Sequence, residues 1–60
     1  MLTNTSSMIL NLLRANLKNE AFNLSKDFIK KNNLDINLDE NNLIYVAAKI
    51  CAFEQNMLGE

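Results

Sequence analysis

Asp35, Asn37 and Asp39 are the residues whose types and spacing come nearest to a metal site in this chain. They match the first three ligand positions of a calcium-binding loop, where alternate oxygen-bearing side chains surround one ion. The loop also needs Gly at its sixth position and Glu at its twelfth, but Glu40 and Val46 stand there. We therefore predict no metal site.

Cys51 is the only cysteine, and the chain has no histidine. A nucleophile would therefore lack the base that most often activates it. Cys51 also falls on the apolar stripe of the last predicted helix, where a free cysteine usually acts as a small hydrophobe. Gly59 is the only glycine, so no Gly-rich loop exists to hold phosphate. We predict neither catalysis nor a cofactor.

The length of the chain predicts a need for a partner. A domain of 60 residues hides only about 60% of the surface of its unfolded chain, so its stability is marginal. Small scaffolds are usually held by disulfides, a metal or another chain. The single cysteine excludes an internal disulfide, and no metal site is predicted. We therefore expect the chain to associate with itself, with another protein, or with both.

Three amphipathic patterns predict one small domain of three helices, over residues 6–18, 20–32 and 40–58. At about 100° per residue, the apolar residues of each pattern share one side of a helix. In the first pattern these are Ile9, Leu10, Leu12, Leu13 and Leu17. In the second they are Ala21, Phe22, Leu24, Phe28 and Ile29, with Ser25 among them. In the third they are Leu43, Ile44, Val46, Ala47, Ile50, Cys51, Phe53, Met57 and Leu58.

The boundaries of these helices follow from capping residues. The first two apolar stripes are out of phase, which favours a break near Asn19 over one continuous helix. Asp39 is predicted to cap the third helix, with Leu38 and Leu43 spaced as a hydrophobic staple. Gly59 is placed to end that helix.

Residues 34–38 alternate between apolar and polar side chains, which is typical of a strand. The chain offers no second segment with which this one could pair. We predict a short extended connector before the third helix. The alternative is a ribbon in which the segment pairs with the same segment of a second chain.

Two polar residues fall where the helical pattern expects apolar ones. Asn16 lies in the first stripe, where it either bonds to nearby backbone or makes a polar contact between subunits. Glu54 lies in the third stripe, where it either reaches solvent or pairs with a lysine of the basic half of the chain. That half, residues 1–33, has a net charge of +3, whereas residues 34–60 have −4.

The third helix carries the strongest indication of a binding surface. Its apolar residues exceed what two short helices can cover. Ala48 and Ala52 are four residues apart and would let another helix approach closely, and Tyr45 offers a large amphipathic contact. We predict a partner-binding surface formed by Tyr45, Ala48, Lys49 and Ala52.

The first two helices also suggest a DNA-binding helix-turn-helix, because they are short, adjacent and basic. In that alternative, Lys26, Lys30 and Lys31 of the second helix contact phosphates or bases. The net charge of −1 for the whole chain argues against it.

The sequence thus predicts a small all-α, oligomeric, non-catalytic protein. We expect regulatory or inhibitory binding to a protein through the third helix, as a homodimer, with a dimeric DNA-binding transcriptional regulator as the alternative. No stretch is apolar enough for a membrane span and no secretory signal is evident, so we expect a cytoplasmic protein. Abundant Asn and the excess of Lys over Arg suggest a bacterial or phage source.

Overall fold

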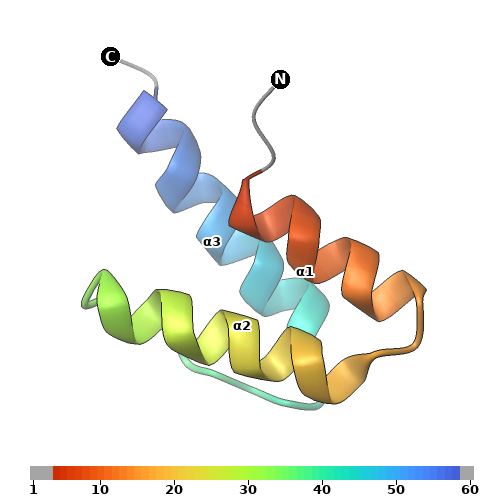
Figure 1. The fold of residues 1–60 in the computed structure, drawn as a ribbon. Coiled ribbons are helices and arrows are strands. Elements are labelled where there is room, and N and C mark those ends of the chain that lie inside the picture. The colour runs from red at the N-terminus through yellow and green to blue at the C-terminus, as the bar shows by residue number, and fades with distance from the viewer. Residues whose placement is uncertain (1–3, 59–60) are drawn as a thin grey trace.

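The computed structural model describes residues 4–58, and three helices account for most of them (Figure 1). Helix α1 spans Thr5–Arg14, α2 spans Lys18–Lys31 and α3 spans Leu43–Leu58. Each helix contacts the other two, and residues 4–58 include no strand. The predicted all-α fold of three helices is confirmed. The predicted end of α3 at Gly59 lies outside the described residues.

Helix α1 ends four residues before the predicted residue 18. Asn16 has a φ angle of 64°, in the left-handed region that stops a helix. The N–H of Leu17 donates to the carbonyl of Leu12 at 2.8 Å, and the N–H of Asn16 donates to the carbonyl of Leu13 at 3.0 Å. These two bonds form a Schellman motif. The predicted break between two helices is confirmed, but it lies at residues 15–17, a few residues before Asn19, which is the second residue of α2.

The early end of α1 changes the role of two residues in its predicted apolar stripe. Asn16 and Leu17 lie beyond the helix, and both are exposed. The prediction that Asn16 is a polar member of the stripe is therefore wrong. Helical spacing was applied to residues beyond the point at which the backbone leaves the helix. It therefore assigned those residues to the wrong side.

Helix α2 ends in the same way as α1. Asn33 has a φ angle of 53°. The N–H of Leu34 donates to the carbonyl of Ile29 at 2.9 Å, and the N–H of Asn33 donates to the carbonyl of Lys30 at 3.2 Å. Asn tolerates left-handed backbone better than most residues other than glycine. Two asparagines thus supply both sharp turns in a chain with almost no glycine.

Helix α3 begins three residues later than predicted. The carboxylate of Asp39 accepts a hydrogen bond from the N–H of Asn41 at 3.0 Å, and the carbonyl of Asp39 accepts one from the N–H of Asn42 at 2.9 Å. Asp39 therefore forms a turn before the helix and does not cap it. The first helical bond follows, from the N–H of Val46 to the carbonyl of Asn42. Short polar side chains compete for local backbone groups, and here the turn prevails.

Residues 34–38 return along α2 to the start of α3, with neither helix nor strand (Figure 1). Leu34, Ile36 and Leu38 are half-buried, whereas Asp35 and Asn37 are exposed. Ile36 and Leu38 pack against the same apolar cluster as Leu43. Leu38 and Leu43 are thus both held at the entry to α3, although Leu43 is the first residue of the helix and not its fourth. An extended conformation and pairing with a second chain stay predictions.

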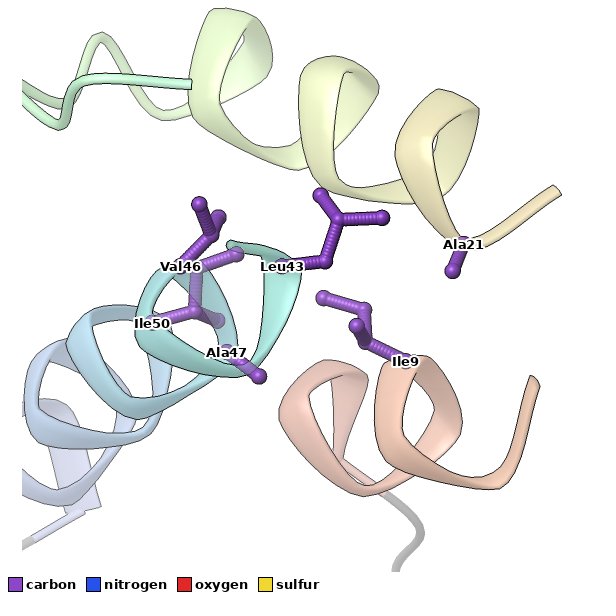
Figure 2. Packing of buried hydrophobic residues seen from close by; sticks show 6 residues of the cluster. All are labelled: Ile9, Ala21, Leu43, Val46, Ala47 and Ile50. Carbon is purple, nitrogen blue, oxygen red and sulfur yellow. The ribbon is translucent and has the colours of Figure 1, made fainter. Parts of the chain in front are cut away.

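The core gathers side chains from all three helices, but α3 supplies most of them (Figure 2). Ile9 comes from α1 and Ala21 from α2, and both are fully buried. The other four members of the buried cluster come from the first half of α3: Leu43, Val46, Ala47 and Ile50. Further along α3, the ring of Phe53 meets that of Phe28 edge to face, with centroids 5.9 Å apart. Such a pair adds about 0.5–1.5 kcal/mol beyond its burial.

A carboxylate of α3 caps the beginning of α1. Glu54 accepts hydrogen bonds from the N–H of Thr5 at 2.8 Å, from the N–H of Ser6 at 3.3 Å and from the hydroxyl of Ser6 at 2.8 Å. The side chain of Asn4 accepts the N–H of Ser7 at 2.9 Å. Both predictions for Glu54, a solvated end and a lysine pair, are wrong. A negative charge at a helix N-terminus satisfies free N–H groups and also complements the helix dipole.

Replacing Glu54 with Ala is expected to lower the free energy of unfolding by about 1.5–3 kcal/mol, because bonds to a charged acceptor are lost from partly buried donors. This is a large part of the total, since about 3–9 kcal/mol is typical for 60 residues. Glu54→Gln keeps one acceptor oxygen and should lose less. Urea unfolding followed by circular dichroism measures both variants.

The control is Asp35→Ala, because Asp35 is exposed in the connector between α2 and α3. It should change the free energy of unfolding by less than about 0.5 kcal/mol. Equal losses for the Asp35 and Glu54 variants would mean that the cap contributes nothing specific.

Candidate protein-binding surface

The four residues predicted to bind a partner lie together on the outer side of α3. Tyr45, Ala48, Lys49 and Ala52 are all exposed, with 46% of Tyr45 accessible to solvent. Their spacing of three, four and seven residues places them on one side of the helix. The buried Val46 and Ile50 point to the other side, into the core. We call Tyr45, Ala48, Lys49 and Ala52 the α3 face.

A cation–π contact holds two side chains of the α3 face in position. The Lys49 ammonium nitrogen lies 5.4 Å from the centroid of the Tyr45 ring. At an exposed site such a contact is worth about 0.5–1 kcal/mol. It brings the Tyr45 ring and the Lys49 ammonium group together on the exposed side of α3. The α3 face therefore combines two small side chains, those of Ala48 and Ala52, with the large aromatic side chain of Tyr45.

The structure adds Ile44 and Leu10 to this surface, and both were predicted to be core residues. Ile44 is 67% exposed and lies one turn before Ala48 on the same side of α3. Leu10 on α1 is 40% exposed. Two signals were present in the sequence: Leu10 is at the edge of its apolar arc, and the arc of the third helix is too wide for two neighbours. The apolar surface thus extends from α3 onto α1.

Two shallow hollows lie between α1 and the beginning of α3, with Leu13 and Ile44 at the boundary that they share. One hollow, of about 320 Å³, is lined by Leu10, Leu13, Arg14 and Ile44. The other, of about 250 Å³, also includes Leu13 and Ile44, and Lys18 and Glu40 border it. The first hollow is mainly apolar with one cation, and the second carries one charge of each sign. We call them the Arg14 hollow and the Glu40 hollow.

The lysines of the DNA-binding alternative lie on α2. Lys26, Lys30 and Lys31 are all exposed, and Lys26 and Lys30 lie on the side of the helix away from the buried Ala21 and Ser25. Lys26 and Lys30 are one turn apart, whereas Lys31 is rotated by about 100° from Lys30. Two of the three cations therefore share a line along the helix.

The residues considered for metal binding and catalysis are not gathered into a site. Within residues 4–58, no cluster of three or more His, Cys, Asp or Glu side chains could hold a metal ion. One Asp39 oxygen is taken by the Asn41 N–H. Cys51 is half-buried on α3. None of the described helices combines the length and the apolar character that a membrane span requires.

Two isoleucines of α3 test the difference between its two sides. Ile50→Ala should lower the free energy of unfolding by about 2–5 kcal/mol, because a fully buried side chain leaves a cavity. Ile44→Ala should cost less than about 1 kcal/mol in the monomer. The measurement is urea unfolding at a protein concentration low enough to exclude association.

If Ile50→Ala does not fold, the milder pair Ile50→Val and Ile44→Val gives the same comparison. Ile50→Val should cost about 0.5–1.5 kcal/mol, and Ile44→Val clearly less. Equal costs at the two positions would show that Ile44 is part of the core.

Comparison with known proteins yields no relative. No family model matches the chain, and no curated protein or solved structure is significantly similar to it. The basis for a function is therefore the chemistry of the surface itself.

Proposed function

We propose that this chain is a small, non-catalytic regulatory or inhibitory protein of the cytoplasm. It acts by binding protein through the α3 face and forms a homodimer through the same surface. The observation that carries the proposal is the exposed apolar surface that runs from Leu10 over Ile44 to Ala48 and Ala52. Contiguous apolar surface of this kind is typical of protein–protein binding sites.

The composition of the surface supports binding to a folded partner. Tyrosine is enriched at interfaces, and charged residues are depleted at their centres. Lys49 is the only charged member of the α3 face, and its ammonium group is directed to the Tyr45 ring. Ala48 and Ala52 allow the backbone of a second helix to come near. The surface thus has an apolar centre and an aromatic anchor.

The size of the molecule also supports association. A stable interface covers roughly 800 Å² on each partner. The accessible surface of this chain is 4571 Å², so such an interface would take less than a fifth of it. The α3 face, Ile44 and Leu10 would form part of that interface. This interface would add apolar burial to a molecule in which the described residues include six buried hydrophobic ones.

Sedimentation of the wild type and of Ala48→Glu tests this proposal. The wild type should sediment at twice the chain mass of 6.8 kDa, and Ala48→Glu should sediment as a folded monomer, since a buried unpaired charge is costly at an interface. Asn23→Glu adds the same charge to exposed α2 and should remain dimeric. A folded monomer for both the wild type and Ala48→Glu would rule out self-association through α3.

The DNA-binding alternative is favoured by one observation, the exposed line of Lys26 and Lys30 on α2. If it holds, affinity for duplex DNA should fall steeply with rising salt, because phosphate contacts release counterions. Replacing both lysines with Gln should reduce the slope of that dependence by about 2. Fluorescence anisotropy with a labelled duplex measures both effects. A lack of binding even at low salt removes this alternative.

A further inference from the structure

Ile44 stands between a hollow that carries a cation and one that carries a carboxylate. Arg14 borders the apolar hollow formed with Leu10 and Leu13, and Glu40 borders the hollow on the other side of Ile44. The exposed isoleucine and the apolar hollow are neighbours on the same face of one molecule. A protruding side chain next to a hollow can make a surface complementary to itself. A two-fold symmetric contact requires such a surface, because both copies use the same patch.

We propose that a second copy of this chain inserts its Ile44 into the Arg14 hollow, and that Arg14 of each copy pairs with Glu40 of the other. This inference rests on the homodimer proposed above and specifies how its two copies meet. The two-fold axis runs between Ile44 and the Arg14 hollow. Each Ile44 then fills the hollow of the other copy, with the two contacts related by symmetry.

The same axis accounts for the positions of the charges. Arg14 lies on one side of the axis, and Glu40 lies beyond Ile44 on the other side. A two-fold rotation therefore brings Arg14 of one copy opposite Glu40 of its partner, twice in each dimer. Arginine is the residue best suited to pair with a carboxylate at an interface, because its planar group donates two parallel bonds. Charges at the rim of an interface fix its register more than its affinity.

Size and polarity favour isoleucine as the occupant. Three of the four residues that line the shallow Arg14 hollow are apolar, which suits a branched aliphatic side chain. Ile44 has 67% of its surface in solvent, more than any other large hydrophobic residue described as exposed. Its insertion would therefore remove much apolar area from water at both ends of the contact.

Lys18 borders the same hollow as Glu40 and provides a control. In the proposed dimer, Lys18 of one copy lies near Arg14 of the other, so its charge opposes the contact. Lys18→Gln should therefore leave the dimer as tight as the wild type or make it tighter. A dimer weakened by Lys18→Gln would contradict the proposed register.

Charge reversal in separate chains provides the decisive test. Arg14→Glu alone places Glu opposite Glu40, and Glu40→Arg alone places Arg opposite Arg14, so each variant should self-associate at least about 10-fold more weakly. Mixing the two variants restores an attractive pair at both contacts. Sedimentation and native mass spectrometry of the mixture should show heterodimers in preference to either homodimer.

The possible results separate this inference from the proposed function. If the wild type is a monomer, both fail. If the wild type is a dimer and Asn23→Glu remains dimeric, but mixing the reversed variants yields no preference for heterodimers, the register is wrong and the α3 dimer stands. Circular dichroism of each variant confirms that it is folded before mixing.

Cross-linking keeps the inference testable if a reversed variant fails to fold. Two chains are prepared with Cys51→Ser, one with Ile44→Cys and the other with Leu10→Cys. Under mild oxidation their mixture should form a disulfide between positions 10 and 44 of different chains. Leu24→Cys in place of Leu10→Cys serves as the control on α2 and should not react. Absence of the 10–44 product, with the mixture dimeric, would overturn the proposal.

Discussion

In the described part of the chain, helix α3 packs against two helices, α1 and α2, and the remaining properties of that part depend on this arrangement. Contacts with α1 and α2 bury Leu43, Val46, Ala47 and Ile50, which all lie on one side of the helix. Within residues 4–58, no further helix or strand covers the other side. The apolar residues there are consequently left in water, at a cost that a partner could relieve. The small core and the exposed surface are thus two consequences of packing α3 against two helices on one side.

The periodicity of the sequence was sufficient to predict the helices, and local backbone geometry explains where it failed. The apolar stripes correctly indicated three helices and most of the core, including Ile9, Ala21 and Val46. They could not show where each helix stops. An asparagine with left-handed backbone ends a helix, but the spacing of apolar residues does not distinguish it from an asparagine within the helix. Asn16 and Asn33 are each followed by leucine, and in both cases that leucine N–H closes the motif.

Long-range contacts were beyond the reach of sequence patterns. Glu54 and Ser6 are 48 residues apart, and only the antiparallel arrangement of α1 and α3 brings the carboxylate to the first turn of α1. The proposed binding surface was predictable in part for the same reason. Residues of α3 that share a side follow from spacing, as for Tyr45 and Ala48, but the contribution of Leu10 depends on how α1 lies against α3. Spacing within one helix is local information, whereas the packing of two helices is not.

The surface and the core are joined rigidly because one helix carries both. Ala47 is buried and Ala48 is exposed, so any displacement of the surface would also disturb the packing beneath it. The cap from Glu54 fixes the start of α1 against α3 at one end, and the contacts of Leu13 fix the other end. The two helices that form the hollows beside Ile44 are therefore held in one arrangement before a partner arrives. A surface ordered in advance loses less conformational entropy on binding, which allows a small interface to be specific.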